Sequence, residues 1–210
     1  MNKNWTVTKK KYLDTEEIRQ LRKVCEDASI IAISKNQMLG VRDWAIIDTA
    51  LSSGLRVSEI SNLKEQDLYL GNGMAELIVM HGKGNRMRTV KIDPALKKHL
   101  KQYIKWKKSK GKKGDWIFFS SMRDKMSIEA MENIFRKYSR KAGLDNCYTF
   151  HSMRHSFAVR LYSITKDLRL VQRMLGHSSP VITQIYADLV EDYINQAFLK
   201  PLYAEFSSNE

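Results

Sequence analysis

The segment LGHSSPVITQIYADL, residues 175–189, contains one histidine and one tyrosine, His177 and Tyr186. Both side chains could pack in a hydrophobic core, or both could act on a phosphate group. A tyrosine hydroxyl has an ordinary pKa of about 10 and is a weak nucleophile at neutral pH. It attacks phosphorus only where a base and nearby cations activate it. The phosphate interpretation therefore requires positive charge from other parts of the chain.

One source of positive charge is Arg56 in SSGLRVSEI, which follows a glycine turn and stands at the start of an expected helix. A guanidinium at this place lies beside backbone N–H groups without helical partners, and such a position suits an anion. Glu59 comes three residues later and can orient the arginine from the same helical face. The alternative is an ordinary surface ion pair, which contributes little to stability.

A second source is HSMRH, residues 151–155, where His151 and Arg154 project from one side of a helix. Two positively charged side chains repel each other, and a shared anion would explain the pairing. His151 and His155 could instead bind a metal at their i, i+4 spacing. The segment lacks the glutamate of the HExxH zinc motif and an obvious third ligand. The remaining alternative is a pair of helix-surface residues.

Lys83 lies between two glycines in HGKGNR, where the backbone can approach a ligand closely. A lysine at a mobile hairpin tip can donate a proton to a leaving group, although an ordinary exposed turn lysine is the alternative. Two arginines could stabilise a pentacoordinate phosphorane through bidentate contacts. These cations make a divalent metal unnecessary, and the sequence has no evident carboxylate cluster to bind one. We therefore expect neither a metal nor a cofactor.

Mostly helical elements are expected to position these residues. Apolar residues at helical spacing predict helices over residues 13–28, 41–54, 55–70, 94–108, 127–143, 151–165, 168–176 and 179–198. The expected boundary residues are Thr15 and Ser127 as N-caps, Pro94 as a first residue, and Gly54 and Gly143 as ends. Residues 75–92 predict a hairpin, and DWIFFSS, residues 115–121, predicts a further short strand. The expected fold class is α+β, predominantly helical with a small antiparallel β-sheet near residues 65–92.

The chain of 210 residues carries a formal net charge of +13 and has a sequence pI near 9.7, which favours a polyanionic partner. Residues 97–113 hold nine lysines and no acid, as a groove wall facing DNA phosphates would. A solvated helix face is the alternative. Two widely spaced cysteines argue against a disulfide scaffold or a cysteine-based zinc site. With no evident signal peptide or membrane span, we expect a cytoplasmic protein.

Four of these motifs occur together in a characteristic order. GLRVSEI, HGKG, HSMRHSFAVRL and LGHSSPVITQIYA resemble the tyrosine recombinase (phage integrase) family over about residues 11–190. Each motif alone is weak, but the four in order are specific. The resemblance implies the catalytic-domain fold of this family and a tyrosine-type DNA strand transferase.

The resemblance also implies a role for each catalytic residue. Arg56 and Arg154 would clamp the phosphate, and Lys83 would protonate the leaving 5′ oxygen. His151 would serve in proton transfer, and His177 would hydrogen-bond the phosphate.

In the same resemblance, Tyr186 is the nucleophile that forms a 3′-phosphotyrosyl link, and Glu59 is the acidic supporting residue. Every position of the catalytic set matches the family pattern.

The implied partner is double-stranded DNA at a specific recombination site, bound by a homotetramer on two duplexes that assembles from monomers. Accessory DNA-bending proteins are a further candidate partner, and no membrane is expected. The expected division is a basic lead-in over residues 1–12, the catalytic domain over 13–190, and a C-terminal helical arm over 191–210. This arm could pack on its own domain or on a neighbouring subunit.

Most family members also carry a separate N-terminal helical domain that clamps DNA. This chain would therefore be either a natural single-domain recombinase or a truncation. A type IB topoisomerase-like enzyme and a DNA-binding regulator that no longer cleaves are the rival functions. A membrane-surface protein is a weaker rival, because no basic segment has a strong apolar face.

Overall fold

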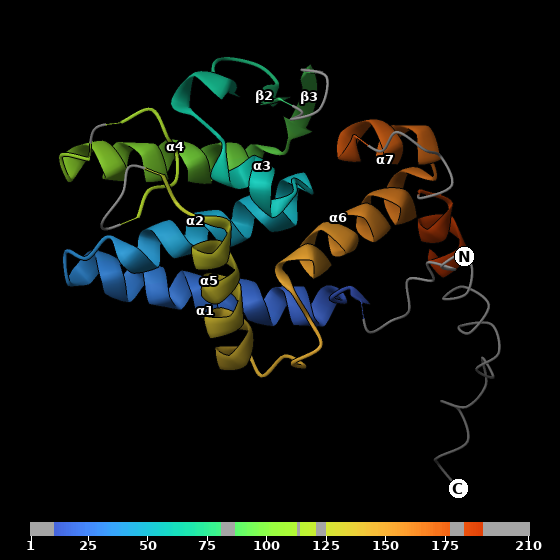
Figure 1. The fold of residues 1–210 in the computed structure, drawn as a ribbon, viewed down its shortest axis with the longest axis horizontal. Coiled ribbons are helices and arrows are strands. Elements are labelled where there is room, and N and C mark those ends of the chain that lie inside the picture. The colour runs from blue at the N-terminus through green and yellow to red at the C-terminus, as the bar shows by residue number, and fades with distance from the viewer. Residues whose placement is uncertain (1–10, 81–86, 113, 121–124, 177–182, 191–210) are drawn as a thin grey trace, which may run out of the picture.

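The computed structural model describes residues 11–80, 87–112, 114–120, 125–176 and 183–190. These residues form a mostly helical fold with one small antiparallel sheet, which confirms the expected fold class (Figure 1). The elements in chain order are α1 (Thr15–Ser34), α2 (Leu39–Ser53), α3 (Val57–Ser61), a 3₁₀ turn (Glu65–Asp67), β1 (Leu68–Tyr69), β2 (Ala75–Met80), β3 (Met87–Ile92), α4 (Pro94–Ser109), α5 (Ile128–Lys141), α6 (Phe150–Thr165) and α7 (Leu168–Leu175). Residues 183–190 form one more helix.

Helix α2 lies at the centre of the main core. It is buried on nearly every side because α1, α4 and α6 all pack against it, and α5 crosses in front of α1 and α2 (Figure 1). Its buried apolar residues include Ala45, Ile46, Ile47, Ala50 and Leu51. The helix also buries polar and charged side chains, among them Arg42, Asp43 and Asp48, and these form hydrogen bonds or ion pairs. It therefore provides a rigid base for the residues that follow its C-terminus.

The C-terminus of α2 is fixed by Gly54, as the sequence predicted. Gly54 adopts a left-handed conformation with φ of 65°, which favours glycine. A Cβ atom at this position would lie 2.3 Å from the ring of Phe157 on α6. The missing side chain thus allows α6 to approach the end of α2 closely.

The expected N-cap of α1 is wrong by one residue. Asp14 caps this helix by accepting from the backbone N–H of Glu17 at 2.9 Å, and Glu17 accepts from the backbone N–H of Asp14 at 2.8 Å. This reciprocal capping box satisfies two N–H groups, which Thr15 inside the helix cannot do.

The helix expected to begin within residues 55–70 is confirmed at its start, where Arg56 is the N-cap of α3, but α3 spans only Val57–Ser61. The chain after α3 pairs with residues 115–117 instead: the Ile117 N–H donates to the Leu63 carbonyl at 2.9 Å, and Glu65 donates to Asp115 at 2.8 Å. The strand expected over residues 115–121 is correspondingly reduced to one antiparallel bridge between Lys64 and Trp116. Pairing between distant segments has overridden the local helical pattern in both places.

The predicted hairpin is confirmed. Strands β1, β2 and β3 form an antiparallel sheet in that order, and Met80 pairs with Met87 at the end nearest the turn. The turn itself, with Lys83, lies outside the described residues. The structure also confirms Ser127 as the N-cap of α5 and Pro94 as the first residue of α4.

A second, smaller apolar cluster joins the C-terminal helices. It contains Ala158 from α6, Val171 and Leu175 from α7, and Tyr186 from the helix over residues 183–190. The predicted C-terminal arm lies outside the described residues. None of the helices in the described part of the chain is both long and apolar enough to cross a lipid bilayer.

Candidate active site

The predicted site residues that the structure describes come from three separate elements. Arg56 and Glu59 lie at the start of α3, His151 and Arg154 lie on α6, and Tyr186 lies on the helix over residues 183–190. The fold brings these elements together where α2, α3, α6 and α7 meet. Lys83 and His177 were predicted as well, but both lie outside the described residues.

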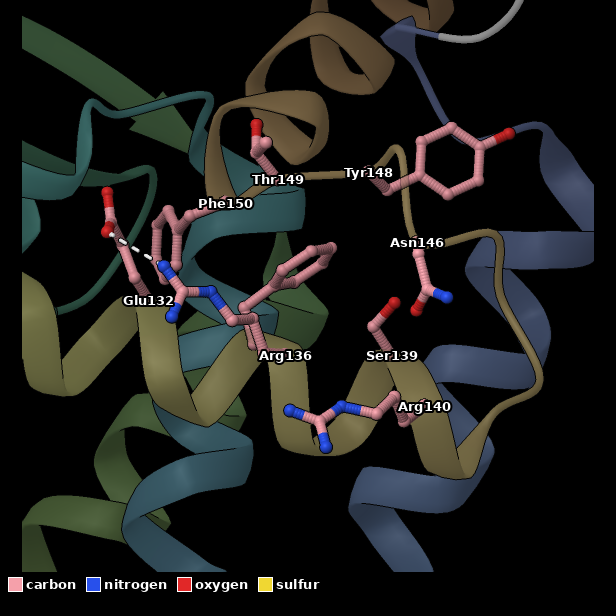
Figure 2. A pocket seen from close by; sticks show the side chains of 9 residues that line it. Glu132, Arg136, Ser139, Arg140, Asn146, Tyr148, Thr149 and Phe150 are labelled. Carbon is pink, nitrogen blue, oxygen red and sulfur yellow. Dashed lines mark ion pairs between the residues drawn. The ribbon is translucent and has the colours of Figure 1, made fainter.

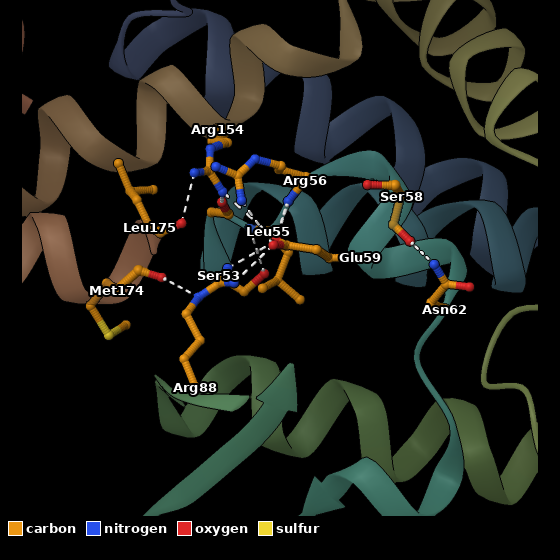
Figure 3. Close-up of polar contacts among 11 residues, drawn as sticks. Ser53, Leu55, Arg56, Ser58, Glu59, Asn62, Arg88, Arg154, Met174 and Leu175 are labelled. Atoms are coloured by element: carbon orange, nitrogen blue, oxygen red, sulfur yellow. Dashed lines mark hydrogen bonds and ion pairs between the residues drawn. The ribbon is translucent and has the colours of Figure 1, made fainter. Parts of the chain in front are cut away.

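The side chain of Arg154 is held by backbone carbonyls. Its Nη1 donates to the Gly54 carbonyl and its Nη2 to the Leu175 carbonyl, each at 2.8 Å (Figure 3). The residue is only 2% exposed. This burial, together with the charge of Arg56, lowers the pKa of Arg154 to about 10. The guanidinium therefore still carries its charge at neutral pH.

Glu59 forms the centre of an arginine cluster. Its Oε1 accepts from Arg56 Nη1 at 3.0 Å, and its Oε2 accepts from the Arg56 backbone N–H at 2.8 Å. Arg154 Nη1 lies 3.8 Å from Oε2. Burial acts to raise the pKa of Glu59, but hydrogen bonds and charge from Arg88, with the Arg56 backbone N–H, outweigh it and lower the pKa to about 2. Glu59 is thus a permanent anion that orients its arginines.

Arg88 on β3 is a member of this cluster that sequence reasoning missed. Its Nη1 and Nη2 donate to the two carboxylate oxygens of Glu59 at 2.8 and 2.9 Å, and its Nε donates to the Met174 carbonyl at 3.2 Å (Figure 3). The strand alternation could have revealed it, because Arg88 shares the inward face of β3 with Val90 and Ile92. A charged residue on a buried face requires a partner. Arg88 joins β3 to α3 and to the end of α7.

Tyr186 is buried at this site, with 2% of its surface exposed. Its hydroxyl oxygen lies 2.9 Å from Nδ1 of His155. Burial raises the pKa of Tyr186 to about 12, and the positive charges of Arg154 and Arg56 act in the opposite direction. Burial outweighs the two arginines, so the hydroxyl stays protonated at neutral pH and would need a base to act as a nucleophile.

The two histidines of HSMRH occupy adjacent positions on α6. The ring of His151 stands edge-on to the ring of His155, with centroids 4.6 Å apart. Desolvation, followed by the charges of Arg154 and Arg56, lowers the pKa of His151 below its ordinary value, although the residue is exposed at the surface. His151 is thus mainly neutral at pH 7 and can exchange a proton. In the sequence, His155 had been considered only as a metal ligand, and its place beside Tyr186 was missed.

Within the described ranges, His, Cys, Asp and Glu side chains form no group of three or more that could hold a metal ion. A cavity of about 270 Å³ lies elsewhere, between α5 and the segment that leads into α6 (Figure 2). Its lining includes Arg136, Arg140, Tyr148 and Phe150. This cavity contains none of the predicted catalytic residues. The chemistry suggested by the sequence belongs to the arginine cluster around Glu59 and to Tyr186.

Known proteins share both the sequence and the fold of this chain. The tyrosine recombinase XerD of Oceanobacillus iheyensis is 32% identical over 181 residues, which cover 84% of this chain and 58% of that protein. The crystal structure of XerA recombinase matches with a TM-score of 0.74 and 26% identity, covering 100% of this chain and 67% of that chain. XerH site-specific recombinase, solved in a pre-cleavage complex with its difH substrate, matches with a TM-score of 0.72 and 26% identity, covering 88% of this chain and 51% of that chain.

The chain spans less than two thirds of the length of the XerD relative. The model of the phage integrase family matches residues 11–192, a range that includes every predicted catalytic residue. This match covers most of the chain and confirms the resemblance noted in its motifs. The chain therefore belongs to the phage integrase family, the family of the tyrosine recombinases.

Proposed function

We propose that this chain is the catalytic domain of a site-specific DNA recombinase that cleaves and rejoins strands through a 3′-phosphotyrosyl intermediate on Tyr186. The observation that carries the proposal is the placement of Tyr186 in the electrostatic field of two clustered arginines, Arg154 and Arg56. A phosphodiester seated between these guanidinium groups would bring its phosphorus to the tyrosine oxygen. A core tyrosine would have no need of these cations.

In the proposed reaction, Arg56 and Arg154 hold the phosphate and offset the additional negative charge of the phosphorane. The Tyr186 oxygen attacks phosphorus, and the 5′ oxygen leaves with a proton from Lys83. His177 hydrogen-bonds the phosphate, and His151 takes part in proton transfer. The covalent link conserves the energy of the phosphodiester, so a 5′ hydroxyl from a partner strand can reverse the step without ATP.

The proposed catalytic domain covers residues 13–190, preceded by a basic lead-in over 1–12 and followed by an arm over 191–210. Its proposed partner is double-stranded DNA, as in the XerH complex with difH, and the proposed assembly is a homotetramer on two duplexes in the cytoplasm. Accessory DNA-bending proteins belong to the same proposal.

The lysine-rich segment over residues 97–113 supplies charge to this proposed DNA surface through its exposed lysines Lys98, Lys101, Lys105, Lys108 and Lys112, and Lys107 is not among them. Lys107 is 1% exposed, and its Nζ donates to Glu65 and to two backbone carbonyls. This lysine stabilises the end of α4 and cannot face phosphates.

The proposal is tested by covalent trapping on DNA. Duplexes that the protein enriches from a random library would be nicked so that the strand beyond the cleavage point dissociates. A protein–DNA adduct on a denaturing gel, lost in Tyr186→Phe, is the expected result. Tight binding without any adduct would contradict the proposal and favour a regulator. Exchange between two differently labelled duplexes would distinguish a recombinase from a topoisomerase-like enzyme, which rejoins only the original strand.

A further inference from the structure

We infer that His155 is a further catalytic residue, the base that accepts the hydroxyl proton of Tyr186 during cleavage and returns it during rejoining. This inference rests on the proposed recombinase function and deepens it. The family resemblance assigns proton transfer to His151. In the structure, however, the imidazole in contact with the reacting oxygen belongs to His155.

The contact has the geometry that general base catalysis requires. The Tyr186 hydroxyl oxygen lies 2.9 Å from His155 Nδ1, which is within hydrogen-bond distance. Tyr186 donates when Nδ1 is unprotonated and the ring proton of the neutral imidazole is on Nε2. Tyr186 is 2% exposed and His155 is half-buried, so the contact is partly shielded from solvent.

The surroundings of His155 and His151 differ, and this difference indicates a separate role for each histidine. Groups that face or adjoin its ring include His151 and Arg154 on its own helix and Tyr186 on the facing helix. His151 is one helical turn before His155, stands edge-on to it, and lies in the field of Arg154 and Arg56. This arrangement places His151 toward the phosphate and His155 toward the nucleophile.

The step balances in atoms and charge. The O–H bond of Tyr186 breaks as the bond from its oxygen to phosphorus forms, and His155 becomes an imidazolium. The bond from phosphorus to the 5′ oxygen breaks, and that oxygen takes a proton from Lys83. During rejoining, Lys83 takes back the proton of the 5′ hydroxyl as that oxygen attacks phosphorus, Tyr186 leaves, and His155 returns its proton to the phenolate. The negative charge of the phosphorane offsets the imidazolium while both exist.

The test is single-turnover cleavage of the nicked duplex across a pH series, with His155→Asn compared with wild type. The asparagine Oδ1 can occupy the place of Nδ1 and accept a hydrogen bond, but it cannot take a proton. We expect cleavage to slow about 100-fold or more, in the range of a lost general base. In wild type, the rate rises with pH as the His155 imidazole loses its proton and can accept that of Tyr186. We expect this rise to disappear in His155→Asn.

A second substrate distinguishes loss of the base that deprotonates Tyr186 from loss of the acid that protonates the leaving 5′ oxygen. Replacing the bridging 5′ oxygen with sulfur gives a leaving group that needs no proton. This substrate should restore cleavage by Lys83→Ala, whereas His155→Asn should stay slow on it, because the nucleophile must still lose its proton. Restoration of His155→Asn to the wild-type rate would assign His155 to the leaving-group side and overturn the inference.

Adduct formation by wild type, with Tyr186→Phe as the negative control, tests the recombinase function separately from the role of His155. If wild type forms no adduct, the recombinase function fails and the role of His155 fails with it. If wild type forms an adduct and His155→Asn matches its rate and pH dependence, only the inference about His155 fails. His151→Asn completes the comparison, because loss of the pH-dependent rise in that variant alone would identify His151 as the base.

Discussion

Arg88 donates to both carboxylate oxygens of Glu59, and this ion pair links β3 directly to α3. The side chains are 10% and 7% exposed, so the pair is largely removed from solvent. Because Arg88 also donates to the Met174 carbonyl, one guanidinium joins the three segments next to Lys83, Arg56 and His177. The integrity of the site therefore depends on a residue outside the predicted catalytic set.

Replacing Arg88 with leucine should destabilise the protein strongly. Removal of one partner of a buried ion pair leaves the other charge poorly compensated, at a cost of about 3 kcal/mol. Arg88→Lys keeps the charge but loses the bidentate geometry, so we expect a smaller loss. Urea unfolding of both variants measures the difference. Equal stability of Arg88→Leu and wild type would show that Arg56 and Arg154 compensate Glu59 without help.

The pKa of Glu59 predicts a specific acid dependence of stability. Its carboxylate is favoured in the folded state, so its contribution is fully present above the unfolded pKa of about 4.5 and disappears as pH falls toward about 2. The difference of roughly 2.5 pH units corresponds to about 3 kcal/mol. We expect the stability gap between wild type and Glu59→Gln to narrow over this range in urea unfolding. A stability gap that stays constant with pH would contradict the lowered pKa of Glu59.

Substitution of Gly54 with alanine should disturb both the fold and the site. The new Cβ would lie 2.3 Å from the Phe157 ring on a backbone with φ of 65°, so steric overlap adds to left-handed strain. The expected loss is about 3 kcal/mol. Gly143→Ala is a matched control, because Gly143 has φ of 68° and its Cβ would meet nothing within 4 Å. The free energy of unfolding of Gly143→Ala should fall by only about 1 kcal/mol. Similar losses for both variants would rule out steric overlap with Phe157 as a cause.

Replacing Arg154 with lysine should slow cleavage strongly. A lysine ammonium cannot reproduce the two-carbonyl anchor of the planar guanidinium or its bidentate contacts to phosphate. We expect the single-turnover cleavage rate to fall about 100-fold or more. Arg160→Lys, an exposed position on the same helix, serves as the control and should cleave normally. A normal rate for Arg154→Lys would remove Arg154 from the proposed phosphate clamp.

Much of this architecture could be predicted because local chemistry determines it. The glycine at the end of α2, the serine before α5 and the hairpin around β2 and β3 follow from caps and alternation. The meeting of Arg56 with Glu59 follows from helical spacing. The residue set at the site was predicted through the order of the motifs, and its catalytic roles stay predictions.

Apart from the N-cap of α1, which is a local error of one residue, the failures depend on contacts between distant segments. The helix expected over residues 55–70 ends early because Leu63 and Glu65 bond to residues more than 40 positions later. Arg88 reaches Glu59 across 29 positions, and His155 reaches Tyr186 across 31. Spacing within one element contains no information about such pairs. The alternation of β3 could have marked Arg88 as inward-facing, but only the folded arrangement shows that it contacts Glu59 and that His155 contacts Tyr186.

The anchoring of Arg154 has a thermodynamic consequence for DNA binding. An arginine that is free in solution gives up about 2 kcal/mol of rotamer entropy when it is immobilised. Here two of the five N–H donors are already committed to the Gly54 and Leu175 carbonyls, so folding has imposed that loss before any ligand arrives. A phosphate therefore meets a preorganised guanidinium, and its contact with Arg154 requires little further loss of side-chain entropy.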